Sequence, residues 1–226
     1  MKPGSLAVRA VAIDLDGTMM DTITDLANAV NLMLDELKLP HLAVDRVRTF
    51  VGKGIVNLVE RSLGAACGQP PDAAMMARAM PVYEGCYDRV NGVQTTIYPG
   101  VVEGIETMRA RGLPLACITN KSGRYTGPLL ERMGFAGYFQ VVLSGDTLPK
   151  KKPDPMPLTF AAQQLGVAPA QLLMIGDSIN DAQAARSAGC PIVCVGYGYN
   201  EGHDVRSLDV DAIVESLVEA AALVRA

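Results

Sequence analysis

The sequence predicts an α/β fold in which helices cover both faces of a parallel sheet. Five short apolar runs, rich in β-branched or aliphatic residues and bounded by turn signals, have the composition of buried strands. They are the run within VRAVAIDLDGT (8–18) that ends at two aspartates, and the runs at 113–119, 140–144, 171–176 and 191–196. Amphipathic stretches alternate with the later runs, and this alternation is typical of parallel strands joined by helical crossovers.

Glycines mark the ends of most of the helices predicted between these strands. Amphipathic stretches are predicted to be helical at residues 100–111, 123–133, 155–165 and 178–188. Gly134, Gly166 and Gly189 directly follow the last three, as expected of residues that end helices. A final apolar run at 211–214 predicts an edge strand, and residues 215–226 predict a terminal helix.

Residues 21–93 break the alternation of strands and helices. They show helical patterns at about 23–38, 54–66 and 72–89 and no convincing strand pattern. We therefore expect a core domain of residues 1–20 and 94–226, with a helical cap domain of residues 21–93 inserted after the first strand. A helical unit at that position lies above the carboxyl end of the first strand, where it can serve as a lid.

Composition restricts the class of protein. The chain has 226 residues, of which 49% are hydrophobic and 19% charged, and its formal charge is -4. We expect a globular protein without the basic surplus that attracts nucleic acid. We also expect no contact with a membrane and a cytoplasmic location, since neither an apolar run of roughly 18 residues nor a signal peptide is evident. The five cysteines, scattered without a CxxC pair, are predicted to be reduced.

The end of the first strand carries two carboxylates. A strand directs every second side chain to one face, so Asp14 and Asp16 are expected to point the same way. Two like charges in one small region are unfavourable unless a cation, a proton or a catalytic task accounts for them. Gly17 permits the sharp turn that leaves backbone N–H groups free to face an anion.

The other strand ends add different chemical groups to the same edge of the sheet, where open α/β sheets bind ligands. Thr119 and Asn120 donate hydrogen bonds without adding negative charge, as a phosphate requires. The run KKKPDP at 150–155 supplies a lysine, and Asp177 adds a carboxylate. Clustered carboxylates are hard oxygen ligands that suit Mg²⁺ far better than zinc or copper.

Four motifs in this order resemble those of the haloacid dehalogenase superfamily, and the helical insertion resembles its cap domain. The motifs are DLDGT at 14–18, Thr119 with Asn120, Lys152 before Pro153, and GDSIND at 176–181. The resemblance spans nearly the whole chain and implies a Rossmann-like core. It further implies a Mg²⁺-dependent phosphomonoester hydrolase, with a small phosphate ester as its partner and a monomer or homodimer as its assembly.

The resemblance also implies the catalytic roles. Asp14 is the implied nucleophile, which forms an aspartyl phosphate and so divides the hydrolysis into two displacements. Asp16 is the implied general acid and base for the leaving oxygen and for the attacking water. Lys152 is the implied source of charge neutralisation, since the family places its lysine immediately before the proline.

The binding roles follow from the same resemblance. Thr119 and Asn120 are the implied phosphate ligands, and Asp181 is expected to lie behind the metal ligands. The implied Mg²⁺ ligands are Asp14, Asp177 and the backbone carbonyl of Asp16.

Within the superfamily, two stretches resemble bacterial phosphoglycolate phosphatases. They are SGDTLPKKKPDPMPL at 144–158 and GYGYNEGHD at 196–204. A cap that closes over phosphoglycolate is expected to bring a positive charge to the carboxylate of this substrate. Lys53, between two glycines in FVGKGIV, is our candidate, although Arg48, Arg61 and Arg89 are other cations of the cap.

Several alternatives share these residues. A dehalogenase uses the same nucleophile on carbon, but needs neither Asp16 nor Asp177. Another small-metabolite phosphatase, or a phosphomutase similar to β-phosphoglucomutase, is compatible with the core motifs. A receiver-like module phosphorylated on aspartate also has a parallel sheet, acids and a lysine, but it needs neither Asp16 nor a large insertion.

Overall fold

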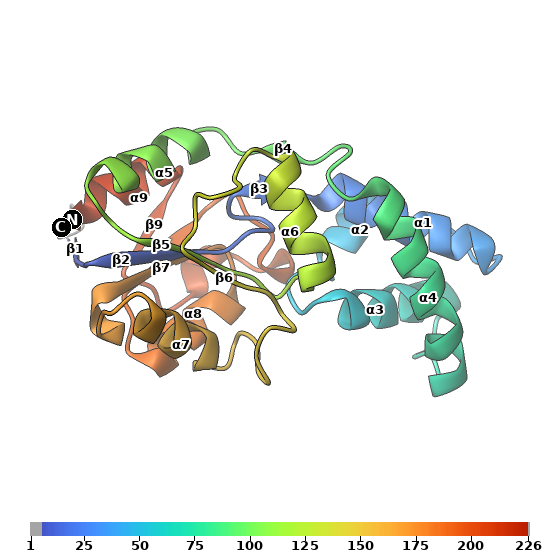
Figure 1. The fold of residues 1–226 in the computed structure, drawn as a ribbon. Coiled ribbons are helices and arrows are strands. Elements are labelled where there is room, and N and C mark those ends of the chain that lie inside the picture. The colour runs from blue at the N-terminus through green and yellow to red at the C-terminus, as the bar shows by residue number, and fades with distance from the viewer. Residues whose placement is uncertain (1–5, 226) are drawn as a thin grey trace.

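A computed structural model describes residues 6–225 and shows a six-stranded sheet at the centre of the core (Figure 1). The order of its strands is β6-β5-β2-β7-β8-β9, and every neighbouring pair is parallel. The bounds are β2 Ala10–Ile13, β5 Leu115–Ile118, β6 Val141–Leu143, β7 Leu172–Gly176, β8 Ile192–Val195 and β9 Ala212–Val214. The prediction of a parallel α/β sheet is confirmed.

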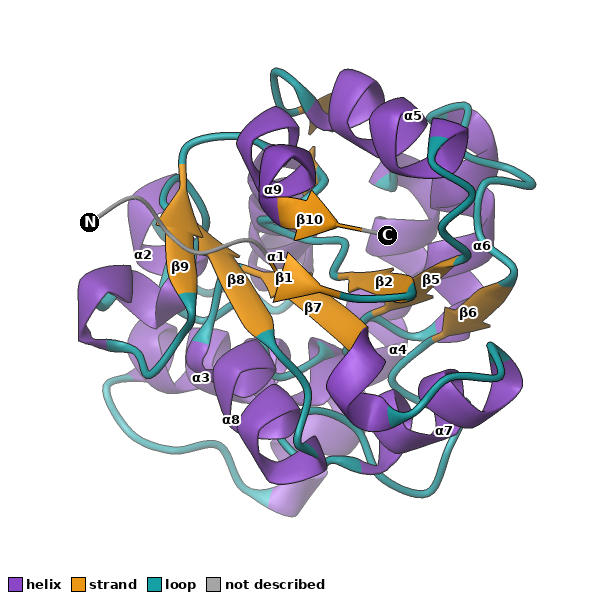
Figure 2. Cartoon of the chain, turned by 90° about the vertical axis from the view of Figure 1, so that its left-hand side faces the viewer, coloured by secondary structure: helices purple, strands orange, loops and turns teal. Residues whose placement is uncertain are grey.

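Helices cover both faces of this sheet, as Figure 2 shows when the sheet is viewed along its strands. The helices are α5 (Val101–Ala110), α6 (Gly123–Arg132), α7 (Met156–Gln164), α8 (Ile179–Ala188) and α9 (Leu217–Leu223). In β2, Val11 and Ile13 pack in the cluster that includes α5, α6 and α9, whereas Ala10 and Ala12 pack with α7 and α8. The alternation arises because successive side chains of a strand point to opposite faces.

The inserted helices form a second apolar cluster at the carboxyl ends of the strands (Figure 1). They are α1 (Ile23–Glu36), α2 (Val44–Arg48), α3 (Ile55–Cys67) and α4 (Ala73–Val90). Buried side chains such as Leu26, Leu34, Leu63 and Tyr83 build this cluster. Because it has its own buried core, we refer to the unit formed by α1–α4 as the helical cap.

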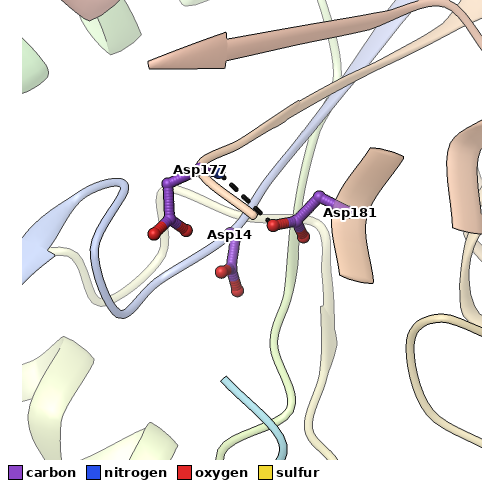
Figure 3. Close-up of side chains that lie close together, drawn as sticks. All are labelled: Asp14, Asp177 and Asp181. Carbon is purple, nitrogen blue, oxygen red and sulfur yellow. Dashed lines mark hydrogen bonds between the residues drawn. The ribbon is translucent and has the colours of Figure 1, made fainter. Parts of the chain in front are cut away.

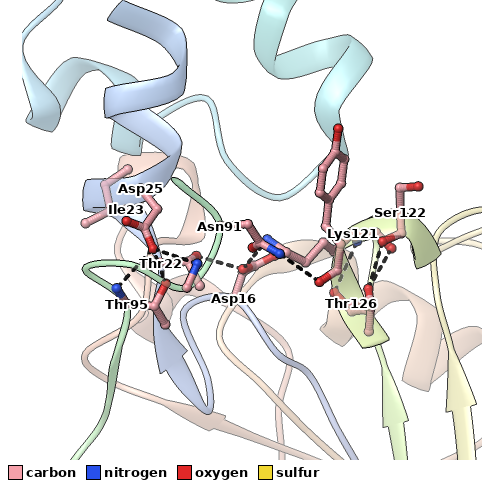
Figure 4. Close-up of polar contacts among 12 residues, drawn as sticks. Asp16, Thr22, Ile23, Asp25, Asn91, Thr95, Lys121, Ser122 and Thr126 are labelled. Atoms are coloured by element: carbon pink, nitrogen blue, oxygen red, sulfur yellow. Dashed lines mark hydrogen bonds and ion pairs between the residues drawn. The ribbon is translucent and has the colours of Figure 1, made fainter. Parts of the chain in front are cut away.

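Short antiparallel strands mark the junction between the helical cap and the core. Strand β3 (Met20–Asp21) pairs with β4 (Thr96–Ile97), so the chain enters and leaves the helical cap side by side. The fully buried Asp25 strengthens this junction. Its carboxylate accepts hydrogen bonds from the backbone of Gly92, Gln94 and Thr95, and from the Thr95 hydroxyl at 2.6 Å (Figure 4).

Three short features differ from the sequence-based expectations. The helix predicted at 215–226 ends at Leu223, and β10 (Val224–Arg225) follows and pairs in parallel with β1 (Leu6–Ala7). Helix α2 and the β3–β4 pair were not predicted either. Elements of two to five residues show no periodicity, because a pattern needs several repeats to be recognised. Among residues 6–225, no helix combines the length and apolar character needed to cross a membrane.

Candidate active site at the carboxyl ends of the strands

Residues that follow β2, β5, β6 and β7 come together in a pocket between the sheet and the helical cap. Asp14, Asp16, Thr119, Asn120, Lys152 and Asp177 all line it. Apolar side chains of the helical cap complete the wall, among them Leu26 of α1 and Leu58 of α3. The residues predicted from the strand ends therefore share one site, as expected of a parallel sheet.

Three buried carboxylates lie close together at this site (Figure 3), and two of them, Asp14 and Asp177, line the pocket. Oxygens of Asp14, Asp177 and Asp181 lie within 4.8 Å of one another. The Lys152 ammonium, itself only 2% exposed, lies 2.8 Å from Asp14 Oδ1 and 2.7 Å from Asp181 Oδ1. Three carboxylates and a single lysine leave an excess of buried negative charge.

Hydrogen bonds orient two of these carboxylates. Thr18 Oγ1 and the Tyr199 backbone N–H donate to Asp177, at 3.1 and 2.7 Å. Asp181 Oδ2 accepts from the backbone and hydroxyl of Ser178, where both residues form the capping box of α8. Lys152 donates to the other oxygen of Asp181, Oδ1. With both oxygens engaged by protein groups, Asp181 is suited to a position behind the predicted metal ligands.

Gly17 allows the loop after β2 to lie against Asp177. Its φ of 85° is in the left-handed region, and a Cβ there would lie 2.5 Å from Asp177 Oδ2. A side chain at this position would therefore displace the carboxylate as well as strain the turn.

Burial sets the protonation of the cluster. Burial, followed by the charge of Asp181, raises the pKa of Asp177 to about 7. Burial also raises the pKa of Asp14 well above its ordinary value, and Lys152 opposes this shift only in part. For Lys152 burial would lower the pKa, but Asp14 and Asp181 hold it above its ordinary value. The ammonium therefore stays charged at neutral pH.

The donor set fits a divalent cation. Clustered carboxylate oxygens are the ligands that Mg²⁺ prefers, and a cation would offset the charge excess that raises the pKa values of Asp14 and Asp177. The cluster contains Asp181 in addition to the predicted carboxylate ligands Asp14 and Asp177. The participation of the Asp16 carbonyl stays a prediction.

The two predicted phosphate ligands differ in their freedom to donate. Thr119 Oγ1 accepts a hydrogen bond from the Lys121 backbone N–H at 3.1 Å, so its own proton stays available. Asn120 Nδ2 donates to the carbonyls of Gly52 and Lys152, at 2.9 and 2.8 Å. Both amide protons of Asn120 are thus in use, which leaves its backbone N–H as its donor to a ligand.

Asp16 lies in a different environment from the other carboxylates. Thr22 Oγ1 donates to Asp16 Oδ1 at 2.7 Å, and the Lys121 ammonium lies 3.1 Å from the same oxygen (Figure 4). Lys121 also donates to the hydroxyl of Tyr87, on helix α4, at 2.5 Å. Sequence reasoning missed Lys121, although its position directly after Thr119 and Asn120 was a usable signal.

Lys53 points to a core carboxylate. Its ammonium lies 2.8 Å from Glu201 Oε1, and Arg61 of α3 contacts Oε2 of the same residue at 3.1 Å. Lys53 is not among the residues that line the pocket, although Gly52 and Gly54 on either side of it are. The predicted contact of Lys53 with a substrate carboxylate stays untested, and its position favours a role in joining the helical cap to the core.

Comparisons with known proteins agree with this geometry. The family model of haloacid dehalogenase-like hydrolases matches residues 11–195. A phosphoglycolate phosphatase of Nitrosospira multiformis is 51% identical over 220 residues, which cover 97% of either chain. That of Thiobacillus denitrificans is 50% identical over 224 residues, or 99% of either chain.

Solved structures show the same architecture. A crystal structure described as a predicted phosphoglycolate phosphatase from Haemophilus somnus superposes with a TM-score of 0.91 at 30% identity, covering 96% of this chain and 97% of the other. CbbY of Rhodobacter sphaeroides shares the fold, with a TM-score of 0.74 at 20% identity, covering 94% of this chain and 96% of the other. From its matching model, its close relatives and the arrangement of its strand-end residues, the chain belongs to the haloacid dehalogenase-like hydrolases.

Proposed function

We propose that this protein is a Mg²⁺-dependent phosphatase that hydrolyses 2-phosphoglycolate to glycolate and phosphate. The observation that carries the proposal is the pairing of Asp14 with Lys152 inside a buried carboxylate cluster, at the floor of a pocket closed by the helical cap. The names of the relatives that are 51% and 50% identical over nearly the whole chain support this choice of substrate.

In the proposed reaction, a carboxylate oxygen of Asp14 attacks phosphorus and the ester oxygen leaves. Asp16 gives its proton to that oxygen, then takes a proton from the water that hydrolyses the aspartyl phosphate. Lys152 stabilises the negative charge around the reacting phosphate and keeps Asp14 oriented through their ion pair. Thr119 donates its free hydroxyl proton, and Asn120 its backbone N–H, to phosphate oxygens.

The proposed metal ligands are Asp14, Asp177 and the backbone carbonyl of Asp16, with Asp181 behind them. Mg²⁺ in this position supplies positive charge that reduces the repulsion between the attacking carboxylate and the phosphate dianion. The role of Asp181 in this arrangement is to hold Lys152 and the turn at Ser178 in place.

The proposal is tested with a panel of phosphate esters at a fixed concentration of Mg²⁺. We expect the highest kcat/KM for phosphoglycolate, with release of one phosphate per glycolate formed. A second ester hydrolysed with a much higher kcat/KM would replace the proposed substrate. An isomerised sugar phosphate formed without free phosphate would instead establish a phosphomutase.

Three finer expectations belong to the same proposal. We propose a cytoplasmic enzyme, a monomer or homodimer, and a division between core and cap at residues 20–21 and 93–94. Light scattering measures the assembly, and fractionation of the source cells measures the location. Limited proteolysis tests the division, since cleavage is expected at exposed junctions between the two units.

A further inference from the structure

We infer that Lys121 binds the carboxylate of the leaving group and thereby selects phosphate esters that carry a second anion. This inference rests on the proposed function. It starts from the position of Asp16, since a general acid must lie within about 2.6–3.2 Å of the oxygen that it protonates. In phosphoglycolate a single methylene separates that oxygen from the carboxylate, so the carboxylate must lie close to Asp16 as well.

Among the described residues that line the pocket, two carry a positive charge: Lys121 and Lys152. The ammonium of Lys152 contacts Asp14 and Asp181 and donates to the carbonyl of Ile118 at 2.6 Å. Two hydrogen bonds and one ion pair thus hold this ammonium group among the buried carboxylates. Lys152 is therefore committed to the phosphate end of the site.

Lys121 lies at the leaving-group end. Its ammonium is 3.1 and 3.4 Å from the two oxygens of Asp16, and its remaining partner is the hydroxyl of Tyr87. The contact with Asp16 Oδ2 is the longest of the three hydrogen bonds, and a substrate carboxylate would take the place of this oxygen as a partner of the ammonium. The side chain of Lys121 is only 3% exposed, so water screens its charge weakly.

The other cations near the junction have partners elsewhere. Lys53 and Arg61 contact Glu201, Lys151 donates to the carbonyl of Lys53, and Arg48 lies 4.0 Å from Asp21. None of these four side chains lines the described pocket. A substrate carboxylate beside Asp16 thus has Lys121 as its cationic partner.

The helical cap fixes the position of this charge. Tyr87 belongs to α4, and the Lys121 ammonium lies 4.9 Å from the centre of its ring as well as against its hydroxyl. Tyr87 is fully buried, and its ring packs 4.6 Å from that of Tyr125 on α6. Lys121 is therefore held where the helical cap meets the core, in contact with the predicted general acid.

The test compares two substrates in matched variants. Phosphoglycolate and ethyl phosphate have leaving groups of similar size, but ethyl phosphate lacks the carboxylate. We expect Lys121→Met to lower kcat/KM for phosphoglycolate about tenfold more than for ethyl phosphate. Lys150→Met is the control, because Lys150 is exposed and contacts Asp154 on the surface; it should leave both values unchanged.

Two further measurements separate binding from positioning. Glycolate should inhibit wild-type hydrolysis of ethyl phosphate competitively, and this inhibition should weaken at least tenfold in Lys121→Met. Tyr87→Phe removes one partner of Lys121 with little change in volume, and should reduce the preference for phosphoglycolate in the same direction. This variant keeps the test decisive if Lys121→Met does not fold.

The outcomes that overturn the inference differ from those that overturn the proposed function. Equal losses on both substrates, with unchanged inhibition by glycolate, would reduce Lys121 to a positioning residue for Asp16. An unchanged preference would place the carboxylate elsewhere, for example at the amino end of α3. Wild-type protein that does not hydrolyse phosphoglycolate would overturn the proposed function itself, and with it the role of Lys121.

Discussion

Asp14 and Asp16 are two positions apart in the chain, yet they have different neighbours. Asp14 is buried against Lys152 and two other carboxylates, whereas Asp16 contacts Thr22 and Lys121. In the proposed reaction, the first environment would hold a carboxylate against the metal and the phosphate, and the second would place one beside the leaving group. Two identical side chains thus acquire the two different roles that the proposed reaction needs.

The nucleophile gives the most direct prediction. Asp14→Asn should lower kcat by several orders of magnitude, because an amide cannot form the covalent intermediate. The melting temperature should stay close to that of wild-type protein, since the amide has nearly the same shape as the carboxylate. Hydrolysis at near-normal rates by the folded variant would refute the proposed mechanism.

The loop after β8 joins the core to the helical cap through Glu201. This residue has a φ of 51°, which is unusual for a side chain other than glycine, and its carboxylate is nearly buried under Lys53 and Arg61. The two cations come from the start and the middle of the segment that contains α3. We refer to Glu201, Lys53 and Arg61 as the closing contact.

The closing contact predicts equal effects on different substrates. Glu201→Gln and Lys53→Met should each lower kcat/KM about fivefold for phosphoglycolate and for ethyl phosphate alike, the effect of about 1 kcal/mol expected of a partly exposed ion pair. The double variant should lose little more than Glu201→Gln alone, because that variant already removes the ion pair of Lys53. A loss confined to phosphoglycolate in Lys53→Met would instead support a direct contact of Lys53 with the substrate carboxylate.

The buried side chain of Asp25 connects helix α1 to the segment that follows α4. Asp25→Ala should lower the free energy of unfolding by about 2–4 kcal/mol, because it leaves buried donors at Gly92 and Thr95 without an acceptor. Urea denaturation measures this loss. Asp35→Ala on the same helix is the control, since that exposed carboxylate pairs with His41 on the surface; a change of about 0.5 kcal/mol or less is expected.

The charge of the site links the stability of the whole molecule to pH and to metal. The native pKa of Asp177 is about 7, above its ordinary value, and that of Asp14 is also raised. Between the ordinary and the native pKa, the folded protein binds more protons than the unfolded chain. Metal-free protein should therefore lose stability as the pH rises through this window, to about pH 7.

Mg²⁺ should reverse this loss by taking the place of the bound protons. We expect Mg²⁺ to raise the melting temperature more at about pH 8 than at about pH 5.5, relative to EDTA. EDTA should also abolish hydrolysis, and added Mg²⁺ should restore it. Asp177→Asn should weaken the pH dependence of metal-free stability. The same thermal shift at both pH values, or full activity in EDTA, would contradict the metal assignment.

Local patterns were sufficient to predict the sheet and the parts of the site carried by its strands. Buried parallel strands read as continuous apolar runs, and the predicted runs at 113–119, 171–176 and 191–196 contain β5, β7 and β8. The carboxyl ends of parallel strands share one edge of the sheet. The positions of Asp14 and Asp177 directly after their strands were therefore sufficient to predict that the two carboxylates lie close together.

Contacts between distant segments depended on the tertiary structure. Lys121 and Asp16 are 105 positions apart, and Lys53 and Glu201 are 148 positions apart. The packing of the helical cap on the core decides which lysine contacts which carboxylate. This packing cannot be predicted from the local periodicity of the sequence. Two-residue strands such as β1 and β10 could not be predicted for the same reason. They are strands because each pairs with a distant segment, and not because of a pattern in their own sequence.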